Sequence, residues 1–381
     1  FTYFKKLRES DDETVGVVAK KSGVYYSELD ERELTLIKMI NLSLLTLDQR
    51  IITEDLAVTK LIPPSLKNEK TVPSNSFWWK MKFKMNKEAK KAAPLKVFGT
   101  PLDSLTLKWG VESDLGVGPE KIKIPIIIDE LISTLRQMDM SVEGIFRKNG
   151  NIKKLKKMTA EIDDNPGGVP DLSKENAIQL SALLKKFIRE LPDPLMTAPL
   201  YNIWINAAKI EAEVEKQRVF SLVYSLLPVP NRNVLEVLMS FLCWTASFSH
   251  IENEMGSKMD IHNLSTVITP NILYLPNSGV PNVSINDVSE SYNDAFAQNE
   301  GEDYFLAIEV VDYLITHNED MGMVPKFSMA LLKDIQKEGL SDYDSVNKFI
   351  TSKLQNHDID FSEFEMQRNI EMKHSTSVVT K

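Results

Sequence analysis

One arginine, Arg147, stands in a short polar break between two stretches with helical periodicity. It belongs to the run GIFRKNG, from Gly144 to Gly150. Upstream, apolar residues repeat at three- and four-residue steps with Pro125 where a helix would begin, and downstream the period resumes at Ile152. An arginine on a loop between packed helices can point into the site of a partner, where its planar guanidinium bridges two anionic oxygens. Taken alone, such an arginine is more often solvated or part of a helix cap.

Two further cations lie in the run LLKKFIRELPDPL, from Leu183 to Leu195. Its apolar residues recur at helical spacing and form one buried stripe. Lys185 and Arg189 are four residues apart and border that stripe together, before Pro192 ends the helix. The alternative is a helix whose rim is charged for solubility.

A third element, NLSTVITPNI, predicts a short helix that carries an amide at its end. Asp260 is the expected cap, and Pro270 is expected to end the helix so that Asn271 lies just beyond it. An amide in that position can bond to the backbone of its own chain or of a partner. Taken alone, an ordinary Asx-turn is the simpler interpretation.

These three stretches, in this order, resemble the Rho GTPase-activating (RhoGAP) domain. Two more agree: VFGTPLDSL resembles the opening of the domain, and LLPVPNRNVLEVL its later helix pair. The resemblance covers roughly residues 97 to 320. Thr269 stands where the family usually has glycine and Ser265 where it often has alanine, and the stretch from Pro276 to Glu302 resembles an insertion.

The resemblance implies an all-α fold and an activator of a Rho-type small GTPase in its GTP-bound form. Arg147 would be the catalytic arginine finger, Lys185 and Arg189 would brace its loop and contact the GTPase, and Asn271 would bond to the GTPase switch region. Hydrolysis would then occur in the partner, which holds GTP and Mg²⁺, so the chain would need no cofactor or metal of its own. It contains no GxxxxGK[ST] phosphate-binding loop.

The sequence around Arg147, MDMSVEGIFRKNGNI, is most similar to fungal RhoGAPs that carry zinc-binding LIM modules ahead of the activating domain. Cys243 is the single cysteine, so no LIM zinc site can be built from this sequence. Because the sequence starts at Phe1, we expect it to be the carboxyl-terminal part of a longer protein. The fungal resemblance favours Rho proper and cell-wall or polarity signalling, but the choice among Rho, Rac and Cdc42 types stays open.

Other functional classes are less well supported. The five histidines form no HExxH pair, Cys243 lies in an apolar helical stretch, and Asp163 and Asp164 lie in a polar run that resembles a turn. The main alternative is a catalytically weak module that keeps the fold but sequesters GTPases or docks on membranes. Retention of Arg147 argues against it, because a pure binder does not need the finger.

Charge is distributed unevenly along the 381 residues. Residues 1–98 hold 18 Lys plus Arg against 13 Asp plus Glu, and the remainder holds 27 against 41, a net charge of −14. Phosphate contacts need clustered cations, so nucleic-acid binding by the acidic part is disfavoured. The single cysteine and the lack of an apolar run of membrane-spanning length predict a cytoplasmic protein, with recruitment to the cell cortex or sites of polarised growth left open.

The segment from Phe77 to Lys91 interleaves lysines with aromatic residues and methionines. This composition suits contact with an anionic membrane. A solvated linker whose tryptophans fold back onto the neighbouring domain is the simpler interpretation.

The remaining pattern divides the chain into five regions. We expect an N-terminal helical region (1–66), this basic aromatic linker (67–96), the RhoGAP domain (97–322), C-terminal helices (323–357) and a polar tail (358–381). Within the first region, Glu28 to Leu47 predicts a helix capped by Asp30. Its apolar face is expected to pack against the segment from Ile51 to Leu61.

Overall fold

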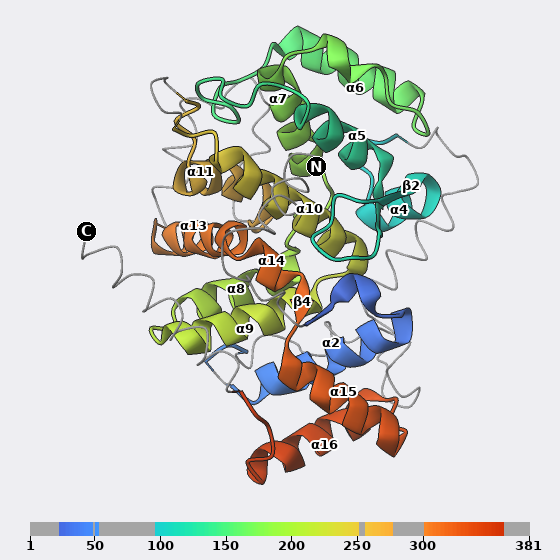
Figure 1. Cartoon of the computed structure of the whole chain (residues 1–381), viewed down its shortest axis with the longest axis vertical. Helices are drawn as coiled ribbons and strands as arrows, with labels where there is room; N and C mark the ends of the chain where they lie inside the picture. The colour runs from blue at the N-terminus through green and yellow to red at the C-terminus, as the bar shows by residue number, and fades with distance from the viewer. Residues whose placement is uncertain (1–22, 49, 53–95, 251–255, 277–300, 362–381) are drawn as a thin grey trace, which may run out of the picture.

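A computed structural model describes residues 23–48, 50–52, 96–250, 256–276 and 301–361. This part of the chain is largely helical, with two short antiparallel sheets, which confirms the all-α prediction (Figure 1). The elements of the central region are α4 (Leu102–Trp109), β2 (Gly110–Ser113), β3 (Ile122–Pro125), α5 (Ile126–Leu135), α6 (Ile152–Asp164), α7 (Ala177–Arg189), α8 (Tyr201–Ala208), α9 (Glu213–Leu226), α10 (Val229–Ala246), α11 (Ile261–Ile272) and α13 (Gly301–Thr316). Before and after them lie β1 (Val24–Tyr25), α2 (Glu31–Thr46), α14 (Asn318–Met321), β4 (Met323–Val324), α15 (Lys326–Glu338) and α16 (Tyr343–Gln355).

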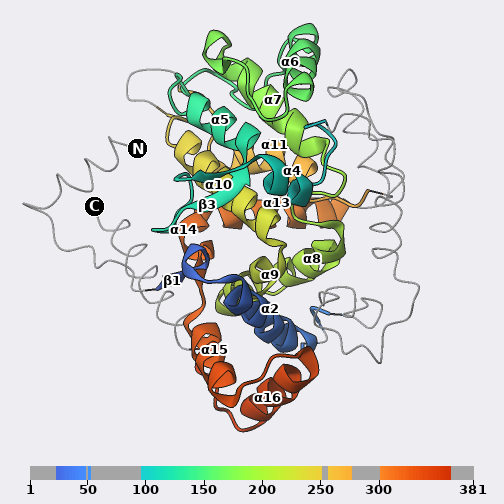
Figure 2. The same cartoon turned by 90° about the vertical axis from the view of Figure 1, so that its right-hand side faces the viewer.

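The long helix α10 forms the centre of the molecule. Most of its side chains are buried, and it packs against α4, α11, α13, α14 and β3. Figures 1 and 2 show α5, α6 and α7 at one end of the long axis and α2, α15 and α16 at the other. One apolar core runs between these ends, so the first and last helices are packed onto the central region.

The helix predicted between Glu28 and Leu47 is α2, and Asp30 is its cap. The Asp30 carboxylate accepts a hydrogen bond from the Glu33 backbone amide at 2.8 Å, and the Glu33 carboxylate accepts one from the Asp30 backbone amide. The buried face of α2 packs against α9, α15 and α16 (Figure 2). Ile51 and Ile52 are also buried, and most of the segment to Leu61 lies outside the described residues.

A buried polar network links the two ends of the chain to the centre. The Asn41 side chain on α2 donates to the Ser225 hydroxyl on α9 at 2.8 Å and accepts from the Ser328 hydroxyl on α15 at 2.7 Å. Nearby, the buried guanidinium of Arg232 lies 4.4 Å from the ring of Tyr26. β1 also pairs with β4, which joins the N-terminal strand to the chain just before α15.

The C-terminal region contains two helices, α15 and α16, separated by Gly339. This glycine ends α15 at a φ of 68°, a left-handed conformation that glycine adopts without steric cost. The basic aromatic segment from Phe77 to Lys91, most of the expected insertion and most of the expected polar tail lie outside the described residues. None of the helices in the described ranges is long and apolar enough to cross a membrane.

Candidate functional site

Arg147 lies on the tight loop between α5 and α6, and its side chain is exposed. The two residues before it, Ile145 and Phe146, are fully buried. Gly144 and Phe146 both have left-handed backbone conformations, with φ of 75° and 64°. For a residue with a Cβ this conformation costs roughly 1–2 kcal/mol. Burial of the Phe146 ring, whose centroid lies 6.1 Å from that of Phe241, offsets the cost.

The loop also bonds to itself around Gly144. Its carbonyl oxygen accepts hydrogen bonds from the amides of Arg147 at 2.9 Å and Lys148 at 2.8 Å. A second acceptor for the Arg147 amide is the Ile145 carbonyl oxygen at 2.8 Å. The backbone of Arg147 is therefore fixed while its guanidinium stays in solvent.

Lys185 approaches the same loop from α7. Its ammonium group donates a hydrogen bond to the carbonyl oxygen of Phe146. Burial lowers the pKa of Lys185 to about 8, because the charged form loses contact with water. The predicted cation thus lies directly beneath the backbone that carries Arg147.

Arg189, one turn further along α7, contacts α11 instead of the loop. Its Nη1 donates to the Pro270 carbonyl oxygen at 2.5 Å, and its guanidinium lies 4.2 Å from the centre of the Tyr274 ring. Arg189 therefore ties α7 to the segment that carries Asn271. Arg189 shares α7 with Lys185, which bonds to the finger loop directly.

The expectation that Pro270 ends its helix is wrong. α11 continues to Ile272, so Asn271 lies within its last turn, and the Asn271 Nδ2 donates to the Val267 carbonyl at 3.0 Å. A proline near the C-terminal end removes one backbone donor, and burial of Ile268 and Ile272 keeps the last turn in place. The expected cap is present, because the Asp260 carboxylate accepts from the Asn263 amide at 2.8 Å.

The segment just before α11 contacts the finger loop from its other side. The Gly144 amide donates to the Ser257 carbonyl at 2.9 Å, and the Lys258 Nζ lies 3.2 Å from the Glu143 Oε1. The sequence did not reveal this second contact. Ser257 contributes a backbone carbonyl, which every residue has, and the ion pair spans 115 positions.

Three residues that the sequence did not assign to the site are Asp163, Asp164 and Cys243. Asp163 and Asp164 lie in the last turn of α6 and not in a turn between helices, which corrects the expectation. Asp163 has a structural task, because its carboxylate accepts hydrogen bonds from the amides of Val97 and Phe98 at 2.8 and 3.0 Å. Cys243 lies in α10, and burial raises the pKa of its thiol.

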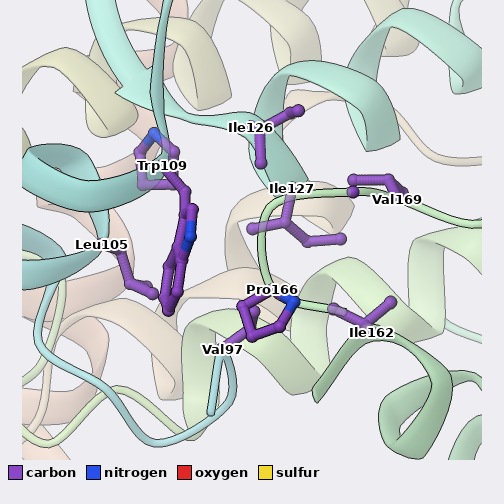
Figure 3. Close-up of a pocket in the computed structure, with 10 residues that line it drawn as sticks. Val97, Leu105, Trp109, Ile126, Ile127, Ile162, Pro166 and Val169 are labelled. Carbon is purple, nitrogen blue, oxygen red and sulfur yellow. The ribbon is translucent and has the colours of Figure 1, made fainter. Parts of the chain in front are cut away.

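An apolar cleft lies between α4, the start of α5 and the end of α6 (Figure 3). Trp109, Ile127 and Pro166 are among its lining residues, none of which is an acid, a base or a nucleophile. Among the residues that the structure describes, no three His, Cys, Asp or Glu side chains are grouped to hold a metal ion. Arg147 is instead an exposed cation on a loop whose backbone is held by Lys185 and Ser257.

Comparison with known proteins agrees with this geometry. The family model of the RhoGAP domain matches residues 125–277, which include Arg147, Lys185, Arg189 and Asn271. Rho-GTPase-activating protein LRG1 of Saccharomyces cerevisiae is 63% identical over the whole of this chain, which covers 37% of that protein. Rho-type GTPase-activating protein 1 of Schizosaccharomyces pombe is 44% identical over 68% of this chain and 21% of its own length.

The chain therefore belongs to the RhoGAP family. It spans about two fifths or less of the length of these two relatives, and both are fungal, in agreement with the fungal resemblance. The crystal structure of human Rho GTPase activating protein 15 aligns with a TM-score of 0.46 at 16% identity. That alignment covers 66% of this chain and 99% of the human one.

Proposed function

We propose that this chain accelerates GTP hydrolysis by a Rho-type small GTPase and that Arg147 is the residue inserted into the nucleotide site. The observation that supports this most directly is the contrast within GIFRKNG. Ile145 and Phe146 are buried and Lys185 holds the Phe146 carbonyl, while the Arg147 side chain is exposed. The fixed backbone thus presents the Arg147 guanidinium, with Lys148 next to it, to an approaching partner.

The chemistry follows from the charge of the reaction. During phosphoryl transfer negative charge spreads over the γ-phosphoryl oxygens and the leaving oxygen, and a positioned guanidinium stabilises it. GTP and Mg²⁺ belong to the GTPase in this proposal, and this chain contributes Arg147 as a charge-stabilising group. In related phosphoryl-transfer systems such an arginine accelerates hydrolysis by roughly 10³–10⁵.

The other candidates have supporting roles in this proposal. Lys185 holds the finger loop through Phe146, and Arg189 holds α11 through Pro270. Asn271 lies on α11 with part of its side chain at the surface, where its amide can bond to the GTPase. Fixing these groups before the partner arrives reduces the entropy that must be lost when the catalytic arrangement forms.

The test is single-turnover GTP hydrolysis by purified Rho-, Rac- and Cdc42-type GTPases. We expect Arg147→Ala and Arg147→Lys to lose most of the acceleration, because an ammonium is a point charge and cannot bridge two oxygens. Arg32 is an exposed arginine on α2 at the other end of the molecule, so Arg32→Ala is the matched control. Its rate should equal that of the unchanged protein.

The alternative is a binding module that sequesters the GTPase without accelerating hydrolysis. Equally slow hydrolysis with the unchanged protein and with Arg147→Ala, together with tight binding of the GTP-loaded form, would establish that alternative. Slow hydrolysis by Arg147→Ala alone, with binding retained, would establish the finger. The same panel identifies the GTPase type.

A further inference from the structure

The charges of α6 are arranged opposite to those that stabilise a helix. Lys153 and Lys154 occupy its first turn, where the helix dipole is positive, and Glu161, Asp163 and Asp164 lie towards its C-terminal end, where the dipole is negative. Both groups therefore oppose formation of the helix. A reversed pattern of this kind calls for an explanation other than the stability of α6.

Several of these charges have partners within the fold. Lys154 pairs with Glu175 at 2.9 Å, and Lys157 pairs with Glu161 at 3.6 Å. Asp163 accepts from two backbone amides, as described above. The acids and two of the four lysines are thus partly accounted for by contacts of α6 with itself and its neighbours.

Lys153 and Lys156 are different. Both are exposed, and neither forms an ion pair with any residue in the described part of the chain. Lys156 lines an open depression together with Lys96 and Lys186 from neighbouring segments, where the carboxylates of Asp163 and Asp164 offset only part of the positive charge. These two lysines add positive charge to the surface without forming an ion pair in the described part of the chain.

In the sequence, this positive charge follows directly after the finger. Residues 147–157 hold six cations and no acid, whereas residues 99–381 as a whole have a net charge of −14. The start of α6 is also fixed relative to α7. The Gln179 side chain accepts from the Asn151 amide at 2.8 Å and donates to the Asn151 carbonyl at 3.3 Å. The first turn of α6, which carries Lys153, is therefore held against α7 a few residues after Arg147.

We propose that Lys148, Lys153 and Lys156 form a basic strip that attracts and docks an acidic surface of the GTP-loaded GTPase. The proposal rests on the function proposed above, because a partner that receives Arg147 must cover the surface beside it. Opposite charges on the two proteins raise the rate of encounter and favour the orientation in which the finger faces the nucleotide. Removal of these charges should then affect capture of the partner more than the hydrolytic step.

The experiment compares Lys153→Gln/Lys156→Gln with Lys333→Gln/Lys337→Gln. The second pair removes two exposed lysines from α15, at the opposite end of the molecule, so total charge and helix propensity change alike. Hydrolysis is measured over a range of concentrations of GTP-loaded GTPase and from about 0.05 M to about 0.5 M salt. This design separates kcat/KM from the rate at saturation.

We expect the α6 variant to lower kcat/KM by about threefold to tenfold at low salt, with the difference disappearing at high salt. The saturating rate and the α15 control should remain those of the unchanged protein. The Tm of the α6 variant should be equal or slightly higher, because Lys153 leaves the positive end of the helix. A lower Tm would instead assign the lysines a structural role.

Three results would overturn the proposal. An unchanged kcat/KM would show that the strip does not meet the GTPase, and a loss that is the same at every salt concentration would show that charge attraction is not the cause. Loss of binding to phosphatidylserine vesicles with unchanged kcat/KM in solution would assign the strip to a membrane. If the unchanged protein and Arg147→Ala accelerate hydrolysis equally little, the function itself fails, which is a separate outcome.

Discussion

The ammonium group of Lys185 donates a hydrogen bond to the carbonyl oxygen of Phe146, the residue immediately before Arg147. This contact crosses from α7 to the finger loop and holds the loop by its backbone. Phe146 has a left-handed conformation, so the loop is held in a shape that it would otherwise tend to leave. The position of Arg147 thus depends on a residue that need not touch the substrate.

Replacement of Lys185 should separate activity from stability. Lys185→Met leaves the Phe146 carbonyl without its donor but also removes a buried charge, so we expect the free energy of unfolding to change by only about 1 kcal/mol. A small displacement of the Arg147 guanidinium from its catalytic position lowers the reaction rate strongly. We therefore expect the hydrolysis rate to fall by roughly 10- to 100-fold. Single-turnover hydrolysis and urea unfolding of the same samples measure both effects.

The adjacent lysine provides the control for that experiment. Lys186 pairs with Glu190 and lies 5.5 Å from the ring of Phe98, away from the finger loop. Lys186→Met should keep most of the activity. Equal losses of activity in the two variants would mean that Lys185 acts only through general packing of α7.

The lowered pKa of Lys185 predicts opposite effects of pH on activity and on stability. Its pKa is about 8 in the folded protein and 10.5 in its ordinary state, so the folded protein releases this proton first. Between those values the unfolded chain binds more protons, and the free energy of unfolding contributed by Lys185 rises with pH. Activity should instead fall as pH rises through about 8, because the charge that holds Phe146 is lost.

The measurement is the hydrolysis rate from pH 7 to pH 9, divided by the intrinsic rate of the GTPase at each pH. Lys185→Arg stays protonated throughout this range, so the activity of this variant should not decline with pH in the same way. Identical profiles for both proteins would assign the decline to another group. Lys38 also has a pKa lowered to about 8 by burial, so the stability profile is repeated with Lys38→Met.

Much of this site could be predicted from local sequence patterns, and the exceptions have physical reasons. The buried stripe of α7 and the caps at Asp30 and Asp260 depend on neighbours within a few residues, which the sequence displays. The sequence predicts that Asn271 lies outside its helix, because a proline usually ends a helix. The burial of Ile272, which keeps the last turn in place, cannot be read from the sequence. Local sequence patterns predicted these helices correctly. The end of α11, however, is determined by tertiary packing.

Contacts between distant segments could not be predicted in the same way. The support of the finger loop by Ser257 depends on a backbone carbonyl, and the packing of α2 depends on three helices from other parts of the chain. The sequence contains lysines at the start of α6 and acids at its end. The proposal that Lys153 and Lys156 bind a partner also depends on their exposure, which the structure gives.

The backbone of Gly144 offers a more local test of the finger loop. Gly144→Ala would adopt a φ of 75° at a cost of roughly 1–2 kcal/mol, and its Cβ would lie 3.1 Å from the Lys148 Cγ. We expect reduced stability together with at least a tenfold loss of activity, on the order expected for a displaced catalytic group. Thermal unfolding and single-turnover hydrolysis measure the two effects.

Gly339 provides a matched control for this variant. Its φ is 68°, and an added Cβ would meet nothing within 4 Å. Gly339→Ala should therefore cost similar stability at the end of α15 and leave hydrolysis unchanged. A comparable loss of activity in both variants would show that activity follows global stability and not the shape of the finger loop.

The network around Asn41 should matter for folding and not for catalysis. Asn41→Ala removes the partner of Ser225 and Ser328 in a buried site, at a cost of about 1–3 kcal/mol. Asn356→Ala, at an exposed position after α16, should cost much less. Urea unfolding measures the difference, and the hydrolysis rate well below the Tm should be the same for both. A selective loss of rate in Asn41→Ala would connect this network to the finger.

The pairing of β1 with β4 has a consequence for how this unit can pass between genes. Residues 125–277 match the RhoGAP family model, but Tyr26 and Asn41 lie outside that range and contact Arg232 and Ser225 within it, and Ser328 bonds to Asn41. Recombination at the limits of the pattern would transfer the finger and leave those groups facing water. The block that can be inherited intact therefore extends at least from Val24 to Ile350, with each end needed to complete the other.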